Sequence, residues 1–180
     1  GTFRTLNLPR PAEQVATPLR RAEAPAFYET VRFLVEGTEP TIERFDSRAF
    51  DETRAAVIRG RVEDENGTPL SGVLVRMPLA PRIGRTVTRA DGTFDLLAQG
   101  GGYVSVEYYL AGRVKVSRQL YVTIGEIVSA PTVILTALDA TSTTLAFPLQ
   151  AAALHAASSI SDQDGQRQAA LLCAQDQKCL

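Results

Sequence analysis

His155 is the only histidine among the 180 residues, and it is the first residue to examine for chemistry. Nucleophilic catalysis of the Ser-His-Asp or Cys-His kind requires an imidazole placed beside a nucleophile. His155 lies in an alanine-rich segment that contains no such motif. We therefore expect a surface or half-buried histidine, and the sequence predicts neither catalytic residues nor a cofactor.

Two pairs of carboxylates are close enough in sequence to be considered as an acid and a base, Asp64 with Glu65 and Asp162 with Asp164. Glycoside hydrolysis needs two such groups on either side of a sugar. Both pairs lie beside glycine in predicted turns, where aspartate commonly accepts hydrogen bonds from its own backbone. The segment after Asp164 lacks the later ligands of a calcium loop, so calcium is only weakly indicated and no metal site is expected.

The two cysteines, Cys173 and Cys179, lie six residues apart near the end of the sequence. A disulfide between them would suit an oxidising compartment, and two unpaired thiols remain the alternative. Without a nearby histidine or a second cysteine pair, this spacing is not typical of a metal site.

A candidate contact patch is formed by Tyr108, Tyr109, Arg113 and Arg118. Successive side chains of a strand point to opposite faces, so one of the two tyrosines must face outward. Tyrosine and arginine are enriched in interface cores, which makes the outward tyrosine and the two arginines a candidate protein contact. Packing at a sheet edge, with solvated hydroxyl groups, is the alternative.

Short runs of alternating apolar residues, separated by glycine turns, dominate residues 54–138. Asn66-Gly67 and Asp91-Gly92 are typical of tight turns, and Gly60 predicts a bulge or a close approach within a strand. We expect a hairpin of 86–89 with 93–96. The sequence predicts a mainly β fold, an antiparallel seven-stranded β-sandwich of Greek-key type. The other expected strands are 56–62, 73–77, 103–109, 114–122 and 128–136.

Two segments flank this predicted sandwich, residues 1–53 and 139–180. Three prolines among residues 1–22 predict an extended arm, and Phe27, Val31 and Leu34 share one face of a short helix predicted over 25–35. Residues 139–180 are expected to be a β-extension with a strand at 141–147. For residues 149–172 both a helix and a hairpin around Asp162-Gln-Asp-Gly165 remain open.

Composition gives no indication of a nucleic-acid-binding or membrane-spanning protein. The 19 basic and 20 acidic residues nearly cancel, so nothing indicates a nucleic-acid partner. No apolar run reaches the roughly 20 residues that cross a bilayer, so no membrane span is expected. Hydrophobic residues at 44% are ordinary for a globular chain.

Strand and turn motifs occupy residues 60–75 and 88–96. They resemble the carboxypeptidase regulatory-like or transthyretin-like β-sandwich domains. This resemblance implies a small, secreted, non-catalytic module, and it does not specify a role, because such modules are attached to many unrelated proteins. Hydrolases of the transthyretin fold rely on more than one histidine and a C-terminal Tyr-Arg-Gly-Ser, which this chain lacks.

A narrower set of motifs comprises residues 54–62, 86–96, 100–102, 131–135 and 164–169. These motifs look like the N-terminal region of bacterial Rhs or YD-repeat proteins, whose large chains form β-shells. This chain has no YD repeat, so encapsulation is not implied.

Together these patterns predict no enzyme. They predict an extracellular or cell-surface structural and protein-interaction module of an exported bacterial protein. It would assemble through its N-terminal arm or form the N-terminal part of an Rhs-like shell, with a protein partner or self-association. A carbohydrate- or ligand-binding module is the alternative, and a hydrolase on a transthyretin-like fold is a third, weaker one.

Overall fold

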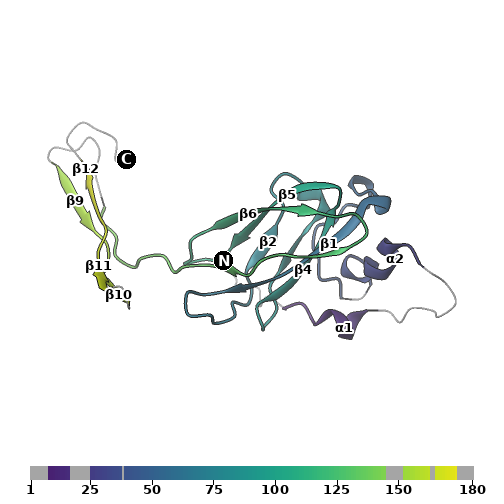
Figure 1. Ribbon diagram of the computed structural model, residues 1–180, viewed down its shortest axis with the longest axis horizontal. Helices are drawn as coiled ribbons and strands as arrows, with labels where there is room; N and C mark the ends of the chain where they lie inside the picture. The colour runs from purple at the N-terminus through teal and green to yellow at the C-terminus, as the bar shows by residue number, and fades with distance from the viewer. Residues whose placement is uncertain (1–7, 17–24, 38, 145–151, 163–164, 174–180) are drawn as a thin grey trace. The chain divides into compact units, whose positions relative to one another are not determined.

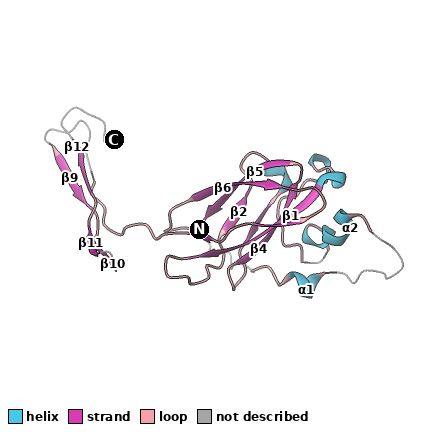
Figure 2. Cartoon of the chain, viewed as in Figure 1, coloured by secondary structure: helices cyan, strands magenta, loops and turns pink. Residues whose placement is uncertain are grey.

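The computed structural model describes residues 8–16, 25–37, 39–144, 152–162 and 165–173. The chain divides into two compact units, Gly1–Ala137 and Leu138–Leu180, and each is described by itself. Strands predominate in both units, whereas helices are few and short (Figure 2). The mainly β prediction is therefore confirmed.

Two sheets make up the first unit. Sheet one has the order β4-β1-β7, with β8 also paired to β1, and sheet two has the order β3-β2-β5-β6 (Figure 1). The strands are β1 (Ala55–Glu63), β2 (Leu74–Arg76), β3 (Arg85–Val87), β4 (Thr93–Gln99), β5 (Gly102–Tyr109), β6 (Val116–Val122), β7 (Ile127–Ser129) and β8 (Val133–Ile134).

Strand β1 is the centre of sheet one. It pairs with β4 antiparallel and with β7 and β8 in parallel, so the sheet is mixed and not purely antiparallel as expected. Residues 128–136 were expected as one strand, but only 128–129 lie in a strand, β7, and 133–134 in another, β8. The described part of this unit thus holds eight strands, and the expected count of seven is not confirmed.

The sandwich core lies between the two sheets. Phe94 of β4 meets Tyr108 of β5 with ring centroids 5.7 Å apart, which places both side chains on the inner faces. A side chain at Gly60 would come within 2.8 Å of the Phe94 ring, so the predicted close approach at this glycine is confirmed. The other fully buried side chains of the strands include Ile58, Val62, Val75, Leu96 and Val106.

The predicted hairpin of 86–89 with 93–96 is wrong. A tight turn does form, because Gly92 N–H donates to the Arg89 carbonyl at 3.0 Å. The chain then crosses between layers, since β3 pairs with β2 in sheet two and β4 pairs with β1 in sheet one. This turn therefore connects the two sheets.

Residues 25–50 pack against the sandwich. Helix α2 (Phe27–Val31) continues as a 3-10 turn, Arg32–Leu34, and it lies beside β1 (Figure 1). The helix is therefore shorter than expected. Its buried side chains are Tyr28 and Val31, followed by Leu34 of the 3-10 turn, whereas Phe27, expected on the buried face, is only partly buried. Further 3-10 turns are Ser47–Ala49, Glu52–Arg54 and Pro81–Ile83.

The predicted extended arm is partly wrong. Residues 8–11 are irregular, but Ala12–Val15 form the short helix α1 after Pro11. Proline is tolerated there because the first N–H groups of a helix have no partner within it. Residues 1–7 of the expected arm lie outside the described residues.

In the second unit the described residues form two antiparallel strand pairs. Strand β9 (Ala153–Ala156) pairs antiparallel with β12 (Ala170–Cys173), and β10 (Ile160–Asp162) pairs antiparallel with β11 (Gly165–Arg167). Residues 141–144 are not in a strand, and the rest of the strand expected at 141–147 lies outside the described residues. The three-part division at 53/54 and 138/139 stays a prediction.

Candidate interaction surface

A groove of about 760 Å³ lies over one end of the outer face of sheet two. Its floor includes Leu74, Val87 and Tyr109, which are register neighbours on β2, β3 and β5. Its volume falls in the range of ligand and peptide sites. The remaining lining residues are Leu8, Pro9, Arg10, Glu39, Pro40, Thr41, Glu43, Gly72, Arg85, Thr86, Leu110 and Ala111.

The walls of the groove come from segments that precede the sandwich in sequence. Arg10 and Glu39 form an ion pair at 2.9 Å, and Arg85 and Glu43 form another at 3.0 Å. All four side chains are at least a third exposed, so each pair contributes little to stability. The rim charges cancel in pairs, which leaves a groove with an apolar floor and a neutral rim.

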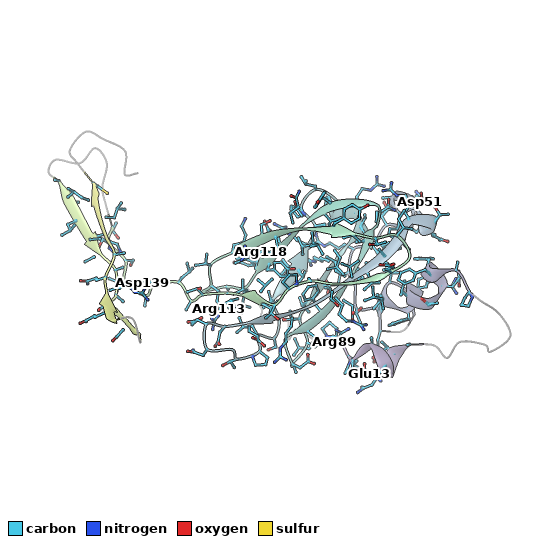
Figure 3. The ribbon with its side chains drawn as sticks, viewed as in Figure 1. Glu13, Asp51, Arg89, Arg113, Arg118 and Asp139 are labelled. Carbon is cyan, nitrogen blue, oxygen red and sulfur yellow. The ribbon has the colours of Figure 1, made fainter. Side chains whose placement is uncertain are left out.

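A buried cluster of charges holds one of these segments. The Asp95 carboxylate accepts hydrogen bonds at 2.6 Å from Arg59 Nε and from the Arg89 guanidinium. The Arg89 Nε donates to the Arg10 carbonyl oxygen at 3.0 Å, 79 residues away in sequence. Figure 3 shows Arg89 beside the segment that carries Glu13. Because Asp95 and Arg89 are both buried, this cluster ties the path of residues 8–16 to the sandwich.

A second charged cluster lies on the outer face of sheet two. Glu107 accepts hydrogen bonds from Arg76 at 2.8 Å and pairs with Lys115 at 3.1 Å. The hydrogen bond from Arg76, followed by that from Lys115, holds the pKa of Glu107 below its usual value. Two cations therefore share one carboxylate, and the face carries a positive surplus.

The four residues of the predicted contact patch lie in different environments. Tyr108 is fully buried and Tyr109 is about half exposed, as their opposite directions predicted. Arg113 is engaged inside the chain, donating to Glu65 at 2.9 Å and to the Leu135 carbonyl at 2.7 Å. Arg118 lies in the middle of β6 and is exposed. A contact role for Tyr109 and Arg118 stays a prediction, whereas Tyr108 faces the core.

Tyr108 carries a buried hydroxyl that has no hydrogen-bond partner among the described residues. Burial raises the pKa of Tyr108 to about 12. We expect Tyr108→Phe to raise the free energy of unfolding by about 1 kcal/mol, because it removes an unsatisfied polar atom and keeps the ring against Phe94. Urea unfolding measures this effect. A loss of stability would show that the hydroxyl is satisfied in solution.

The other residues singled out from the sequence stabilise turns and short contacts. The Asp64 carboxylate accepts backbone N–H groups of Asn66 and Thr68, and the Thr68 bond is the main cause of its lowered pKa. His155 Nδ1 lies 2.8 Å from the Thr143 hydroxyl. The described residues contain no cluster of three or more potential metal ligands.

Three of the residues singled out from the sequence lie at the end of a described range or outside the described residues. Cys173 is buried. Cys179 and Asp164 lie outside the described residues. The disulfide between Cys173 and Cys179 therefore stays a prediction.

Asp139 was not singled out from the sequence, because its partners lie up to 19 residues away. Its carboxylate accepts N–H groups of Thr141 at 2.8 Å and Ser158 at 2.6 Å, as well as the Ser158 hydroxyl. These bonds, with that of Thr141 the largest cause, lower the pKa of Asp139 to about 2. An Asp two residues before Thr is the only local signal of this arrangement.

The Asp139 contacts predict a dependence on acid. Because the folded pKa lies below the ordinary value of 3.8, the stabilisation is present above about pH 4 and is lost as the pH falls through about 2. We expect the amide proton of Ser158 to titrate by NMR with a midpoint near pH 2. Asp139→Asn serves as the control and should abolish that titration. A midpoint near pH 4 would show that the carboxylate is not held.

Chemically, these groups bind and position other parts of the chain. The buried Asp95 carboxylate lies between two guanidinium groups, and Asp64 and Asp139 accept backbone N–H groups. No helix among the described residues is long and apolar enough to cross a membrane. The described surface offers a groove and a charged outer face on sheet two.

The sequence of the sandwich is similar to that of known proteins. Residues 50–135 match the family model of the Teneurin TTR-like domain. Teneurin-4 of Mus musculus is 37% identical over 89 residues, which are 49% of this chain and 3% of that protein. Teneurin-m of Drosophila melanogaster is 35% identical over 104 residues, 57% of this chain and 4% of that protein. The match supports the transthyretin-like fold, while a carboxypeptidase regulatory-like relationship is not shown.

The matched relatives overturn the expected source. They are animal teneurins, so the prediction of an exported bacterial, Rhs-like protein is wrong. The chain spans only 3–4% of the length of these relatives. Among solved structures, catechol 1,2-dioxygenase from Pseudomonas arvilla C-1 has a TM-score of 0.38 and 13% identity, and it covers 52% of this chain and 55% of that chain. A similarity at that level says nothing about chemistry.

Proposed function

We propose that the chain is a non-catalytic structural and protein-interaction module, in which a TTR-like sandwich fixes the path of the segments that precede it. The observation that carries this proposal is the bond from the buried Arg89 guanidinium to the Arg10 carbonyl, supported by Asp95. A charge-assisted bond to a backbone carbonyl holds a chain segment independently of its side chain.

The same anchoring continues along residues 39–50. Glu43 and Arg85 exchange both backbone hydrogen bonds, at 2.8 and 3.0 Å, which adds a bridge to the edge of β3. The Thr86 hydroxyl donates to the Thr41 carbonyl at 2.9 Å. Ile42 packs closely on Gly84, because a Cβ added at Gly84 would lie 2.5 Å from Cγ2 of Ile42. These contacts support a module whose outer segments are part of its shape.

The anchored segments also build the groove. Leu8–Arg10 and Glu39–Glu43 form its walls, while sheet two forms its floor. The interaction surface therefore depends on the anchoring, because loss of residues 8–10 would open one wall. This dependence links the structural role to the proposed contact with other proteins.

Hydrogen exchange tests the anchoring. In the intact chain the amides of Gln14 and Ala16, which donate within the first short helix, should exchange more slowly than in an unstructured peptide. Arg89→Gln should bring them to the unstructured rate. Arg48→Gln, which changes an exposed arginine on another turn, should leave them protected.

A second variant separates anchoring from overall stability. Arg89→Gln also removes one partner of Asp95, so the sandwich itself could loosen. Deleting residues 1–16 leaves the Asp95 cluster intact, and the sandwich should stay folded by circular dichroism. Unprotected amides at Gln14 and Ala16 in the unmodified chain would refute the proposal.

A further inference from the structure

Strand β6 is a free edge of sheet two. Among the described strands it pairs only with β5, in a register that runs from Gly102 opposite Val122 to Tyr108 opposite Val116. The opposite edge of the sheet, β3, is bridged by the backbone of Glu43. Just before β6, Val114 N–H donates to the Thr136 carbonyl, and no corresponding bond is found along Val116–Val122 on its outer side within the described chain.

Arg118 occupies an unusual position on this edge. Its register partner, Val106, is fully buried on the inner face of sheet two, so Arg118 belongs to the inward set of β6 with Val116 and Leu120. Arg118 is nevertheless exposed, because β6 is the last strand of the sheet. Within the described residues its guanidinium forms no ion pair, and its one hydrogen bond goes to the adjacent Ser117 carbonyl at 3.4 Å.

Sheet two carries further positive charge besides the unpaired Arg118. On its outer face Arg76 of β2 and Lys115, which precedes β6, share the single carboxylate of Glu107. Arg118 belongs to the inward set of β6 and is itself matched by no carboxylate within the described residues. A protein segment that approaches this edge is favoured when it carries negative charge.

An inward charge on an edge strand also opposes pairing between copies. A second copy paired antiparallel about Arg118 would place its own Arg118 directly opposite. The two Cβ atoms would lie about 5 Å apart, and two positive side chains would face each other. Registers that place Arg118 against Val or Leu would leave a cation beside apolar side chains without a partner. A carboxylate in the facing position reverses this penalty, because it forms a charge-assisted bond with the guanidinium.

We propose that β6 accepts an added strand from a partner protein. The segment is extended and has an aspartate or glutamate opposite Arg118, with apolar residues two positions to either side, opposite Val116 and Leu120. Main-chain hydrogen bonds to the free edge supply affinity, and Arg118 supplies selectivity by rejecting cationic and wholly apolar strands. This inference deepens the interaction role proposed above, on which it rests, but it is independent of the anchoring through Arg89.

Two labelled peptides test the proposal on the full chain by fluorescence anisotropy. One has glutamate at its centre, valine two positions to either side and threonine elsewhere, and the other has lysine at its centre. The glutamate peptide should bind at least about tenfold more tightly, because its carboxylate faces the Arg118 guanidinium whereas the lysine places a like charge there. Arg118→Gln should abolish this preference and Arg118→Glu should reverse it, whereas Arg48→Gln should retain it.

Two further readouts locate the bound strand. Amide exchange along Val116–Val122 should slow when the glutamate peptide binds, and binding should weaken with salt because the pair is exposed. Equal binding of both peptides, absence of binding, or an unchanged preference in Arg118→Gln would overturn the proposal. A dimer of the unmodified chain in sedimentation, abolished by Arg118→Glu, would also overturn it and assign the edge to a second copy. None of these results depends on protection of the Gln14 and Ala16 amides.

Discussion

Asp95→Asn is expected to lower the free energy of unfolding by about 3 kcal/mol, because it leaves the Arg89 guanidinium buried without its counter-charge. Both side chains of this ion pair are less than a tenth exposed, and their atoms lie 2.6 Å apart. The uncompensated cation should also weaken the hydrogen bond to the Arg10 carbonyl. Urea unfolding followed by circular dichroism measures the loss.

Arg59→Gln is the matched control for this change. Arg59 bonds the other oxygen of the same carboxylate at 2.6 Å, but its side chain is about half exposed. Water therefore screens it, and its loss should cost about 1 kcal/mol or less. Equal losses in the two variants would show that burial of Arg89 is not the source of the stability of the cluster.

The alternation and turn chemistry of residues 54–138 predicted the existence of most strands. Asn66-Gly67 and Asp91-Gly92 do form turns, and each glycine has a φ of +78°. The sequence predicted the pairing of the strands less well than their existence. Alternation shows which side chains share a face, but it does not show which neighbour a strand joins, so β3 and β4 were joined in one sheet by prediction and lie in two.

Burial of both faces of β4 was also not predictable from the sequence. Phe94 and Leu96 face the sandwich, while Asp95 and Leu97 on the other side are also buried. A polar residue at an alternate position predicts a solvated face. Asp95 is buried because Arg59 and Arg89, from separate elements, meet it there. Arg59 is 36 residues away in sequence and Arg89 is six, and neither spacing by itself indicates a buried carboxylate.

The candidate interaction surface was predicted only in part. Opposite directions for Tyr108 and Tyr109 follow from strand geometry and are observed. The groove could not be inferred, because its walls and floor come from segments up to about a hundred residues apart in sequence. The edge position of Arg118 likewise depends on the order of strands, which places β6 last in sheet two.

Gly92→Ala is expected to cost about 3 kcal/mol of unfolding free energy, since two penalties coincide at the turn that joins the sheets. With φ at +78°, any side chain is strained by about 1 kcal/mol. The added Cβ would also lie 2.6 Å from the Val62 carbonyl oxygen, and displacing a packed backbone costs about 1–3 kcal/mol more.

Gly67→Ala isolates the first of these penalties. Gly67 has the same φ of +78°, but a Cβ there would meet nothing within 4 Å. Its replacement should therefore cost only about 1 kcal/mol. The difference between the two variants in urea unfolding measures the close packing of the Gly92 turn against β1. If both alanines cost the same, the contact with Val62 is relieved freely, and the crossing between the sheets is less tightly packed than the structure indicates.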